Sequence, residues 1–375
     1  MVQHAEHEVF KKLRHATQAA GYDALVAFSP DNVSYTAGVL LPSHALNRFR
    51  RTISVLAGDS FAAQVVVTVE EKLARERSRF RDIRPYGQFD QNAVDVLADI
   101  LEEAGVADGK IAIELDYMPA EDYIRLSARL PRARFFECKS IYFKTRMIKT
   151  DAEVATLRRV GALTDQVIGS VLATIKPGVT EAEIGRQIAD RMYAGGCGDL
   201  KYQVGSGINS GITNCGTSDK KVEKGDVIRV EVLGSLDNYR SNVTRTAVMG
   251  QATAEQKAIW KTLIGARDIC KSMLRPGTRV PDLYSAYVKA CHSGGIEPTL
   301  QFLGHGIGQT IHEEPYITTT RDIVLEPNIT FTMEPLYMIP GRMGFHVEDM
   351  YVITKGGFEP LSGDATPNDQ LIAIG

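Results

Sequence analysis

Three segments in the second half of the chain alternate apolar and polar residues, as strands with one buried face do. In "VIRVEV" the apolar residues share one face and leave Arg229 and Glu231 on the other. In "NITFTME" the alternation separates Glu334 from three apolar residues, and in "FHVEDM" His346 and Glu348 share a face. Because side chains alternate across a strand, these segments predict a β-sheet whose polar face carries three carboxylates. A solvated sheet face would explain each strand taken alone.

The segment "LGHGIGQTIHEEP" adds two histidines, His305 and His312, among glycines that permit close approach of the backbone. A single buried histidine is usually a hydrogen-bonded core residue. Two histidines beside "ITFTMEP" and "VED" favour a functional cluster of imidazoles and carboxylates.

The chain up to about residue 140 has a different pattern from the rest. Amphipathic helices alternate there with the short apolar strands "DALVAFS", "TISVLAG", "AAQVVVTV" and "KIAIEL", which is typical of an α/β layer with a mostly parallel sheet. Later, capping boxes at Thr150, Thr180 and Thr253 predict three helix starts. Since 375 residues are many for one core, we expect an N-terminal domain at 1–143 and a C-terminal domain at 144–375.

Composition and charge argue against several classes of partner. A net charge of −3 gives no basic surface for nucleic acid or an anionic membrane. The first residues do not resemble a secretory signal, and the longest apolar runs are far shorter than a membrane span, so we expect a cytoplasmic protein. Five scattered cysteines without a CxxC pair predict reduced, structural thiols.

Eight motifs then carry a resemblance to a known family. In order along the chain they are "SPDNVSYTAG", "RMIKTDAEVATLR", "VGSGINS", "SDKKVEKGDVI", "NVTRT", "GHGIGQTIHEEP", "TMEP" and "VEDM". Together they resemble the M24 family of creatinase, aminopeptidase P, prolidase and methionine aminopeptidase. The resemblance implies an α/β (α+β) protein in which a creatinase-type α/β domain precedes a pita-bread catalytic domain.

The resemblance also implies a set of metal-ligand positions. Family metallopeptidases bind two divalent ions through two aspartates eleven residues apart, a histidine and two glutamates. The matching positions here are Glu231, Asn242, His305, Glu334 and Glu348. The last three match the family, whereas the first is a longer carboxylate and the second is a neutral amide.

Two further positions depart from the family pattern. Asn214 occupies the place of a histidine that binds substrate or moves a proton, and His346 stands where peptidases usually have an arginine. We expect Asn214, Asn242 and His346 to contact the substrate.

These substitutions argue against a dinuclear metal centre, because hard cations prefer anionic oxygen ligands and Asn242 offers a single neutral oxygen. One divalent ion (Mn, Zn, Fe or Co, which the sequence does not distinguish) could still be held by His305, Glu334 and Glu348, with Asn242 or water completing the shell. If no metal binds, crowding of the carboxylates raises at least one pKa and provides a general acid or base.

Three functions are compatible with these residues. We first favour a creatinase-like hydrolase of a C–N bond (amide, amidine or related) in a small, carboxylate-bearing substrate. In it, His305 and His312 polarise the substrate, His346 orients the set, and three carboxylates act as acid, base or nucleophile, namely Glu231, Glu334 and Glu348. The alternative is a metal-dependent Xaa-Pro dipeptidase or aminopeptidase with a modified metal site. A second alternative is a non-enzymatic member of the fold that binds peptide or protein.

A basic cluster in "LLPSHALNRFRR" extends the expected site to the first domain. It contains His44, Arg48, Arg50 and Arg51. Since the resemblance implies a homodimer in which the first domain of one subunit lies near the cleft of the other, Arg48 and Arg50 could clamp a substrate carboxylate. A solvated basic surface explains the same residues.

Overall fold

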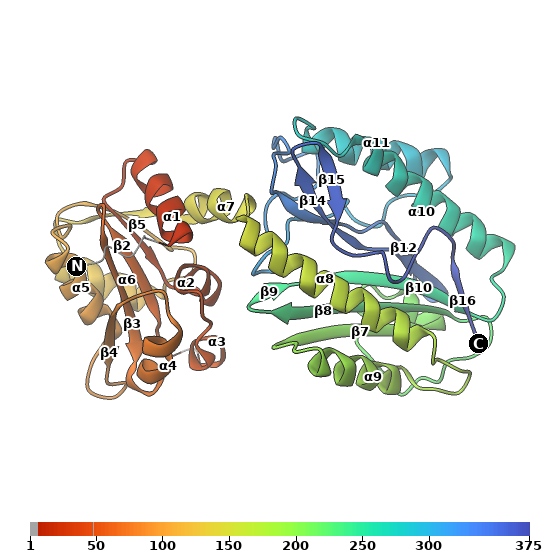
Figure 1. Ribbon diagram of the computed structural model, residues 1–375, viewed down its shortest axis with the longest axis horizontal. Coiled ribbons are helices and arrows are strands. Elements are labelled where there is room, and N and C mark those ends of the chain that lie inside the picture. Colours follow the sequence, from red (N-terminus) through yellow and green to blue (C-terminus); the bar gives the residue numbers. More distant parts are fainter. Residues whose placement is uncertain (1–6, 48) are drawn as a thin grey trace. The chain divides into compact units, whose positions relative to one another are not determined.

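The computed structural model describes residues 7–47 and 49–375, and the chain divides into two compact units between Arg146 and Met147 (Figure 1). The expected domain boundary after residue 143 falls inside helix α7 (Lys139–Met147). Within the described residues, none of the helices combines the length and the apolar composition that crossing a membrane requires.

The first unit is built on a six-stranded sheet with the order β4-β3-β2-β1-β5-β6. Its strands are β1 (Ala24–Ala27), β2 (Ile53–Ala57), β3 (Phe61–Val67), β4 (Asp82–Tyr86), β5 (Lys110–Ile113) and β6 (Arg134–Glu137). Three of its pairings are parallel, but β2 runs antiparallel to both β1 and β3. The expected mostly parallel sheet is therefore mixed, because the short connection between β2 and β3 permits only a hairpin.

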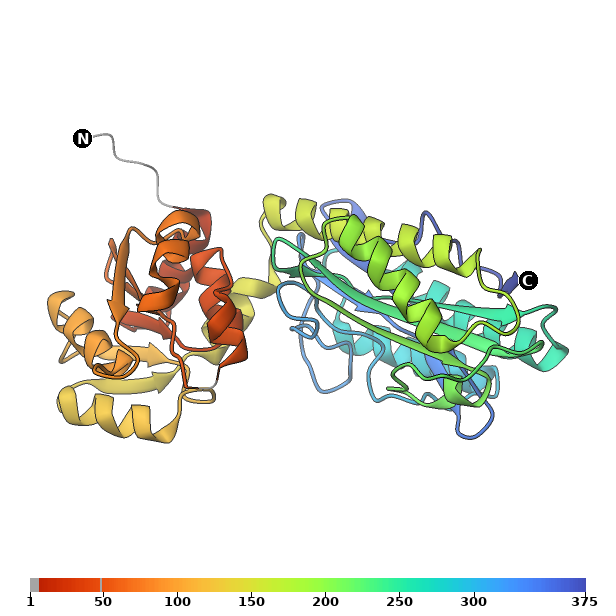
Figure 2. The same ribbon diagram turned by 90° about the horizontal axis from the view of Figure 1, so that it is seen from below.

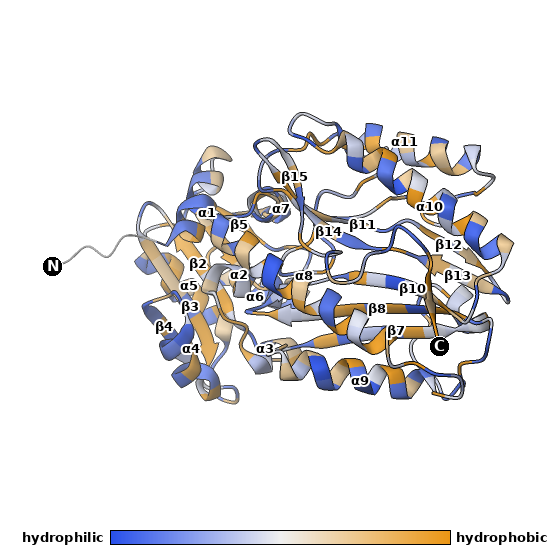
Figure 3. Cartoon of the chain, turned by 45° about the vertical axis from the view of Figure 1, so that its right-hand side comes forward, coloured by the Kyte–Doolittle hydropathy of each residue, from blue (hydrophilic) through white to orange (hydrophobic). Residues whose placement is uncertain are grey.

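Helices cover both faces of this sheet. They are α1 (Glu8–Ala19), α2 (Pro30–Ala37), α3 (Pro42–Leu46), α4 (Glu71–Arg77), α5 (Ala93–Glu103), α6 (Ala120–Arg129) and α7. Apolar residues of α5 and α6 pack on one face, and those of α1, α2 and α7 pack on the other. Figure 3 shows the result as hydrophobic strands between helices with hydrophilic outer faces.

The second unit contains three small sheets. The first has the order β16-β10-β8-β7, with β9 paired to β8; the second is β11-β14-β15, and the third is β12-β13. The strands are β7 (Leu200–Ser206), β8 (Val227–Leu236), β9 (Tyr239–Arg240), β10 (Val243–Met249), β11 (Thr330–Met333), β12 (Leu336–Ile339), β13 (Met343–His346), β14 (Asp349–Thr354), β15 (Gly357–Pro360) and β16 (Ile372–Ile374).

Four helices cover the outer faces of these sheets. They are α8 (Asp151–Leu172), α9 (Glu181–Ala194), α10 (Ala254–Met273) and α11 (Val280–Ser293). Figure 2 shows α8 and α9 along one side of the strands β7, β8 and β10, while α10 and α11 pack against β11 and β14. The predicted capping boxes at Thr150, Thr180 and Thr253 are all confirmed by reciprocal side-chain bonds.

A backbone bridge joins the first sheet to the segment that leads into the second. Thr244 of β10 and Glu348 exchange two N–H···O bonds of 3.2 Å each. The strand predicted in "FHVEDM" is therefore wrong as one continuous strand, since it does not run unbroken through "HVEDMYVIT". It is divided into β13 and β14 because the chain leaves its hairpin with β12 at His346 and pairs with β11 from Asp349 onward.

Candidate functional site

The structure brings His305, Glu334 and Glu348 together between the sheets. All three side chains are buried, and one ligating atom from each lies within 4.8 Å of the other two. Nε2 of His305 is 3.3 Å from Oε1 of Glu334 and 3.9 Å from Oε1 of Glu348. The three residues that match the family's ligand pattern thus form one compact cluster.

Strand β8 supplies Glu231, and the residue directly before β10 supplies Asn242. A two-residue turn at Asp237 and Asn238, both with positive φ, joins β8 to β9 and fixes the register, so that Thr244 lies opposite Glu231. Asn242 is two residues from Thr244 and therefore lies on the same face. Its Oδ1 is buried and has no hydrogen-bond partner among the described residues.

Glu231 belongs to a row of hydrogen-bonded side chains that leads to the exposed residue Asn214. Its Oε2 accepts a hydrogen bond of 3.2 Å from Nε2 of Gln203, which is also 3.3 Å from Oδ1 of Asn214. Asn214 is exposed and lines the cavity, as does Glu231. The amide at 214 is thus placed where it could meet a substrate.

Close packing of glycines fixes the backbone that carries His305. A Cβ atom on Gly304 would lie 1.9 Å from the carbonyl oxygen of Thr332, and one on Gly306 would lie 2.2 Å from that of Glu314. Nδ1 of His305 is 3.0 Å from the carbonyl oxygen of Gly306. Since a carbonyl only accepts, Nδ1 donates to it, and this contact directs Nε2 toward the carboxylates.

Two further histidines, His312 and His346, adjoin the cluster. Nε2 of buried His346 is 3.6 Å from Oε2 of Glu334 and 3.9 Å from Oε2 of Glu348. The ring of His312 stacks on that of His305 with centroids 3.7 Å apart. His312 lines the cleft, and its partial burial, together with the electrostatic effect of the neighbouring His305, lowers its pKa to about 4.

The carboxyl groups ionise differently in the absence of a cation. Burial opposes ionisation of Glu334, but the imidazoles of His305 and His346 outweigh it and lower the pKa to about 2. Burial and the nearby carboxylates of Glu334 and Glu231 raise the pKa of Glu348 well above its usual value. Burial also raises the pKa of Glu231, against the opposing effects of His346 and Arg229.

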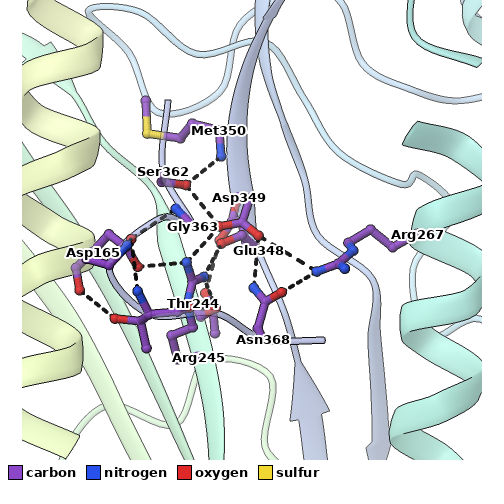
Figure 4. Close-up of polar contacts among 12 residues, drawn as sticks. Asp165, Thr244, Arg245, Arg267, Glu348, Asp349, Met350, Ser362, Gly363 and Asn368 are labelled. Atoms are coloured by element: carbon purple, nitrogen blue, oxygen red, sulfur yellow. Dashed lines mark hydrogen bonds and ion pairs between the residues drawn. The ribbon is translucent and has the colours of Figure 1, made fainter. Parts of the chain in front are cut away.

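A buried network behind the cleft holds the strands that carry these groups (Figure 4). Arg245 donates to the carbonyl oxygens of Thr244 and Glu348, at 2.9 Å each, and to the carboxylates of Asp165 and Asp349, at 2.8 and 2.7 Å. The network thus ties α8, β10 and β14 together next to the ligand cluster.

The cluster opens into a cavity of about 320 Å³, and some of the residues that line this cavity were not predicted from the sequence. Gln203, Arg229 and Phe302 line it together with the expected residues. Arg229 had a signal, since the alternation in "VIRVEV" places it on the face of Glu231. Gln203 and Phe302 had none, because neither belongs to a recognised motif.

His44, Arg50 and Arg51 of the basic cluster line a separate cavity of about 490 Å³, together with Phe28 and Tyr117. In it, Arg51 pairs with Asp122 at 2.5 Å and Arg50 donates to Gln88 at 2.8 Å. Arg48 lies outside the described residues. The expected clamp at Arg48 and Arg50 therefore remains a prediction.

The ligand cluster suits one metal ion. The buried atoms that lack a hydrogen-bond partner in the described part of the chain include Asn242 Oδ1, His305 Nε2, Glu334 Oε1 and Glu348 Oε1, each of which could ligate a cation. An imidazole nitrogen with carboxylate and amide oxygens is a donor set that divalent transition metals accept.

Comparisons with known proteins identify the family to which the chain belongs. The chain matches the model of metallopeptidase family M24 over residues 155–355 and that of the creatinase/prolidase N-terminal domain over residues 10–148. It is 33% identical over 232 residues to the probable dipeptidase PepE of Mycobacterium tuberculosis, but the match covers only 61% of each chain. It is 27% identical over 365 residues to an Xaa-Pro dipeptidase of Lactobacillus helveticus, covering 94% of this chain and 95% of the other. The crystal structure of dipeptidase PepE from Mycobacterium ulcerans superposes with a TM-score of 0.85 at 27% identity, over 97% and 96% of the two chains.

Proposed function

The chain belongs to metallopeptidase family M24, and we propose that it hydrolyses a peptide C–N bond in a dipeptide-sized substrate with one divalent metal ion. His305, Glu334 and Glu348 would hold the ion, and Asn242 would add a further oxygen. The dipeptidase names of the mycobacterial and Lactobacillus relatives support the peptide bond as the target. They favour the peptidase alternative over the creatinase-like reaction that the substitutions first suggested.

The observation that carries the proposal is the contact between His305 and Glu334. When the ring carries a proton on Nδ1 alone, Nε2 and Oε1 present lone pairs to each other at 3.3 Å. Two facing acceptors repel unless a cation or a proton lies between them. A divalent ion bound by both atoms, by Glu348 and by Asn242 would remove this repulsion and give each of these four unpartnered atoms a partner.

The same residues favour one ion over two. A second ion would need an anionic bridge at position 242, and the Asn242 amide is neutral with one carbonyl oxygen. Glu231, which would hold that second ion, accepts a hydrogen bond from Gln203. We therefore assign Glu231 to proton transfer.

A divalent ion at this place would supply a Lewis acid that polarises the scissile carbonyl. Glu231 would take a proton from the attacking water and pass it to the leaving nitrogen, a role that suits a buried carboxyl group with a raised pKa. His312, whose pKa is about 4, stays neutral near pH 7 and can donate a hydrogen bond to the substrate.

The test is the metal content of the purified protein, combined with hydrolysis of dipeptides such as Gly-Pro before and after chelation. We expect about one ion per chain and chelator-sensitive cleavage. Glu334→Gln should remove the ion and lower kcat by at least about 100-fold, whereas Glu359→Gln, which changes an exposed carboxylate, should alter neither. Cleavage that persists in metal-free protein would overturn the proposal.

Asn242→Asp gives a second, independent measurement. Restoring an anionic oxygen beside Glu231 should raise the bound metal from about one toward about two ions per chain. Metal analysis after gel filtration measures this without any assay of activity. An unchanged metal content in a folded variant would argue against the assignment of position 242 as the cause of single-ion binding.

A second candidate is a metal-free hydrolase of a small amide or amidine, as in creatinase. The specific observation in its favour is the pair of neutral amides, Asn214 and Asn242, at two site positions. In that case the protonated carboxyl group of Glu348, whose pKa is raised, would act as the acid. Absence of metal and of dipeptide cleavage, with turnover of guanidino or cyclic amide acids, would identify this reaction.

A further inference from the structure

Arg229 is a buried cation that the chemistry above does not use. Its side chain is 1% exposed, and it lies two residues before Glu231 on the same face of β8. Its Nη2 donates to the carbonyl oxygens of Ile212 and Thr213 and, at 3.4 Å, to Sγ of Cys215. Nε and Nη1, by contrast, have no hydrogen-bond partner within the described part of the chain.

An unpaired guanidinium is costly to bury, because it stays protonated and loses its hydration. The carboxylates nearby do not neutralise it directly. Glu231 accepts from Gln203, Glu334 lies in the ligand cluster, and Arg229 forms an ion pair with neither. The cavity between them is open to a small molecule. The missing partner of Arg229 is therefore an anion that comes from outside the chain.

We propose that Arg229 binds the C-terminal carboxylate of a dipeptide substrate, which would make the chain a dipeptidase that rejects longer peptides. This inference rests on the proposed function. Among the residues that line the described cavity, Arg229 is the one arginine or lysine. It therefore supplies the charge that selects for a carboxylate.

The size and walls of the cavity define the rest of the substrate. At about 320 Å³ the cavity is small, so a molecule that reaches both Arg229 and Glu334 has its carboxylate only a few bonds from the reacting bond. Leu300, Phe302 and Leu336 line the same cavity and offer apolar contact to a side chain or ring. A short substrate with an apolar C-terminal residue fits these walls.

The first experiment compares kcat/KM for Ala-Pro and for its C-terminal amide. The wild-type protein should prefer the free acid by about 10- to 100-fold, as expected for a hydrogen bond between charged groups. Arg229→Met should abolish this preference by lowering kcat/KM for the acid alone, and Arg229→Lys should retain part of it. Ala-Glu amide tests whether a side-chain carboxylate can replace the terminal one. If the wild-type protein cleaved Ala-Glu amide as efficiently as Ala-Pro, the assignment of Arg229 to the C-terminal carboxylate would be overturned.

A purely structural role for Arg229 predicts a different result. If its only function were to hold the carbonyls of Ile212 and Thr213, Arg229→Met would lower kcat/KM for acid and amide by the same factor. Arg158→Met removes an exposed arginine of the same unit and should leave both values unchanged. Equal loss on both substrates, or a wild-type protein without preference, would refute the proposal.

A binding measurement keeps this inference separate from the proposed reaction. Calorimetric titration of Glu334→Gln with Ala-Pro and Ala-Pro amide requires no turnover and no folded Arg229 variant. The acid should bind about 10- to 100-fold more tightly than the amide. Equal affinities, or no measurable binding of either compound, would reject Arg229 as a carboxylate receptor, whatever the reaction proves to be.

Discussion

Glu334 and Glu348 occupy one buried cluster, yet their surroundings drive their protonation in opposite directions. Two imidazoles lower the pKa of Glu334 to about 2, against the effect of burial. Burial and two neighbouring carboxylates raise the pKa of Glu348. A cation would favour the ionised form of both groups, so binding of a metal ion and release of a proton are coupled at this site.

His44, in the first unit, offers a cleaner test of pH dependence because it lies in a different unit from the ligand cluster. Burial lowers its pKa from 6.5 to about 4, so between these values the unfolded chain binds a proton that the folded chain does not. The free energy of unfolding should therefore fall as the pH is lowered from about 6.5 to 4, by about 3 kcal/mol in total. Urea denaturation at several pH values measures this.

The comparison for that experiment is His44→Gln. The free energy of unfolding of this variant should fall much less over the same pH range than that of the wild-type protein. His292→Gln, at an exposed histidine, should keep the decline of the wild-type protein. If His44→Gln and the wild-type protein lose stability in parallel, the buried neutral state of His44 is not its cause.

Residues inside motifs were predictable, and those that act through tertiary contacts were not. His305, Glu334 and Glu348 lie in short segments of recognisable spacing, and the structure brings them together. Asp165 gave no such signal, because its partners Arg245, Gly363, Ala365 and Thr366 lie at least 80 positions away in the chain. Arg245 gave a weak one, as a charge on the apolar face of "NVTRTAV".

At the scale of elements, the segment that precedes His305 depends on contact between backbones. Gly304→Ala would place a Cβ atom 1.9 Å from the carbonyl oxygen of Thr332 in β11, so loop and strand must separate. We expect a loss of about 1–3 kcal/mol, as for overpacking, together with weaker metal binding, because His305 moves with the loop. Gly265→Ala, in α10, meets no atom within 4 Å and is the matched control. Metal affinity equal to that of the wild-type protein in Gly304→Ala would contradict this account.

The Arg245 network should be the largest single contribution to the stability of the second unit among its ion pairs. Arg245→Met leaves Asp165 and Asp349 buried without their shared cation, and loss of one member of a buried pair costs about 3–5 kcal/mol. Thermal unfolding of the variant measures the effect. Arg158→Ala removes an arginine from an exposed pair with Glu359 and should change the melting temperature little. Similar melting temperatures for the two variants would rule out the buried network as a major stabilising feature.

Helix starts were predictable because the capping box is local, and all three were confirmed. The division of "HVEDMYVIT" at residues 347–348 was not predictable, because it arises from pairing with three different strands. Strand β7, which carries Gln203, was missed because its sequence "LKYQVGS" has no clear alternation.

At the scale of the whole molecule, each unit buries its own apolar core. The hydrophobic clusters of the first unit contain no residue beyond 142 in their buried cores, and those of the second contain none before 157. A fragment of residues 147–375 should therefore fold alone and unfold in one cooperative transition. Fluorescence of Trp260, the single tryptophan, reports on that unit. A fragment without a cooperative transition would show that the second unit depends on the first.

The fold class was predictable at this scale, and the matches to both family models confirm it. Eight short motifs in family order specify which sheets and helices occur. The antiparallel placement of β2 was not predictable from the alternation of elements, because alternation is compatible with several strand orders. The homodimer that the resemblance implies stays a prediction.

The turn at Asp237 and Asn238 determines which residues of β8 and β10 face the site. Both residues have positive φ, which sets a tight hairpin and, through it, the register of Glu231 against Thr244. Insertion or deletion of one residue there would reverse the faces of β10, so that Asn242 would enter the core and Arg245 would enter the cleft. Substitutions at positions 231 and 242 can thus change the chemistry of the site. The spacing of these two positions is set by a turn that is not part of the cavity lining.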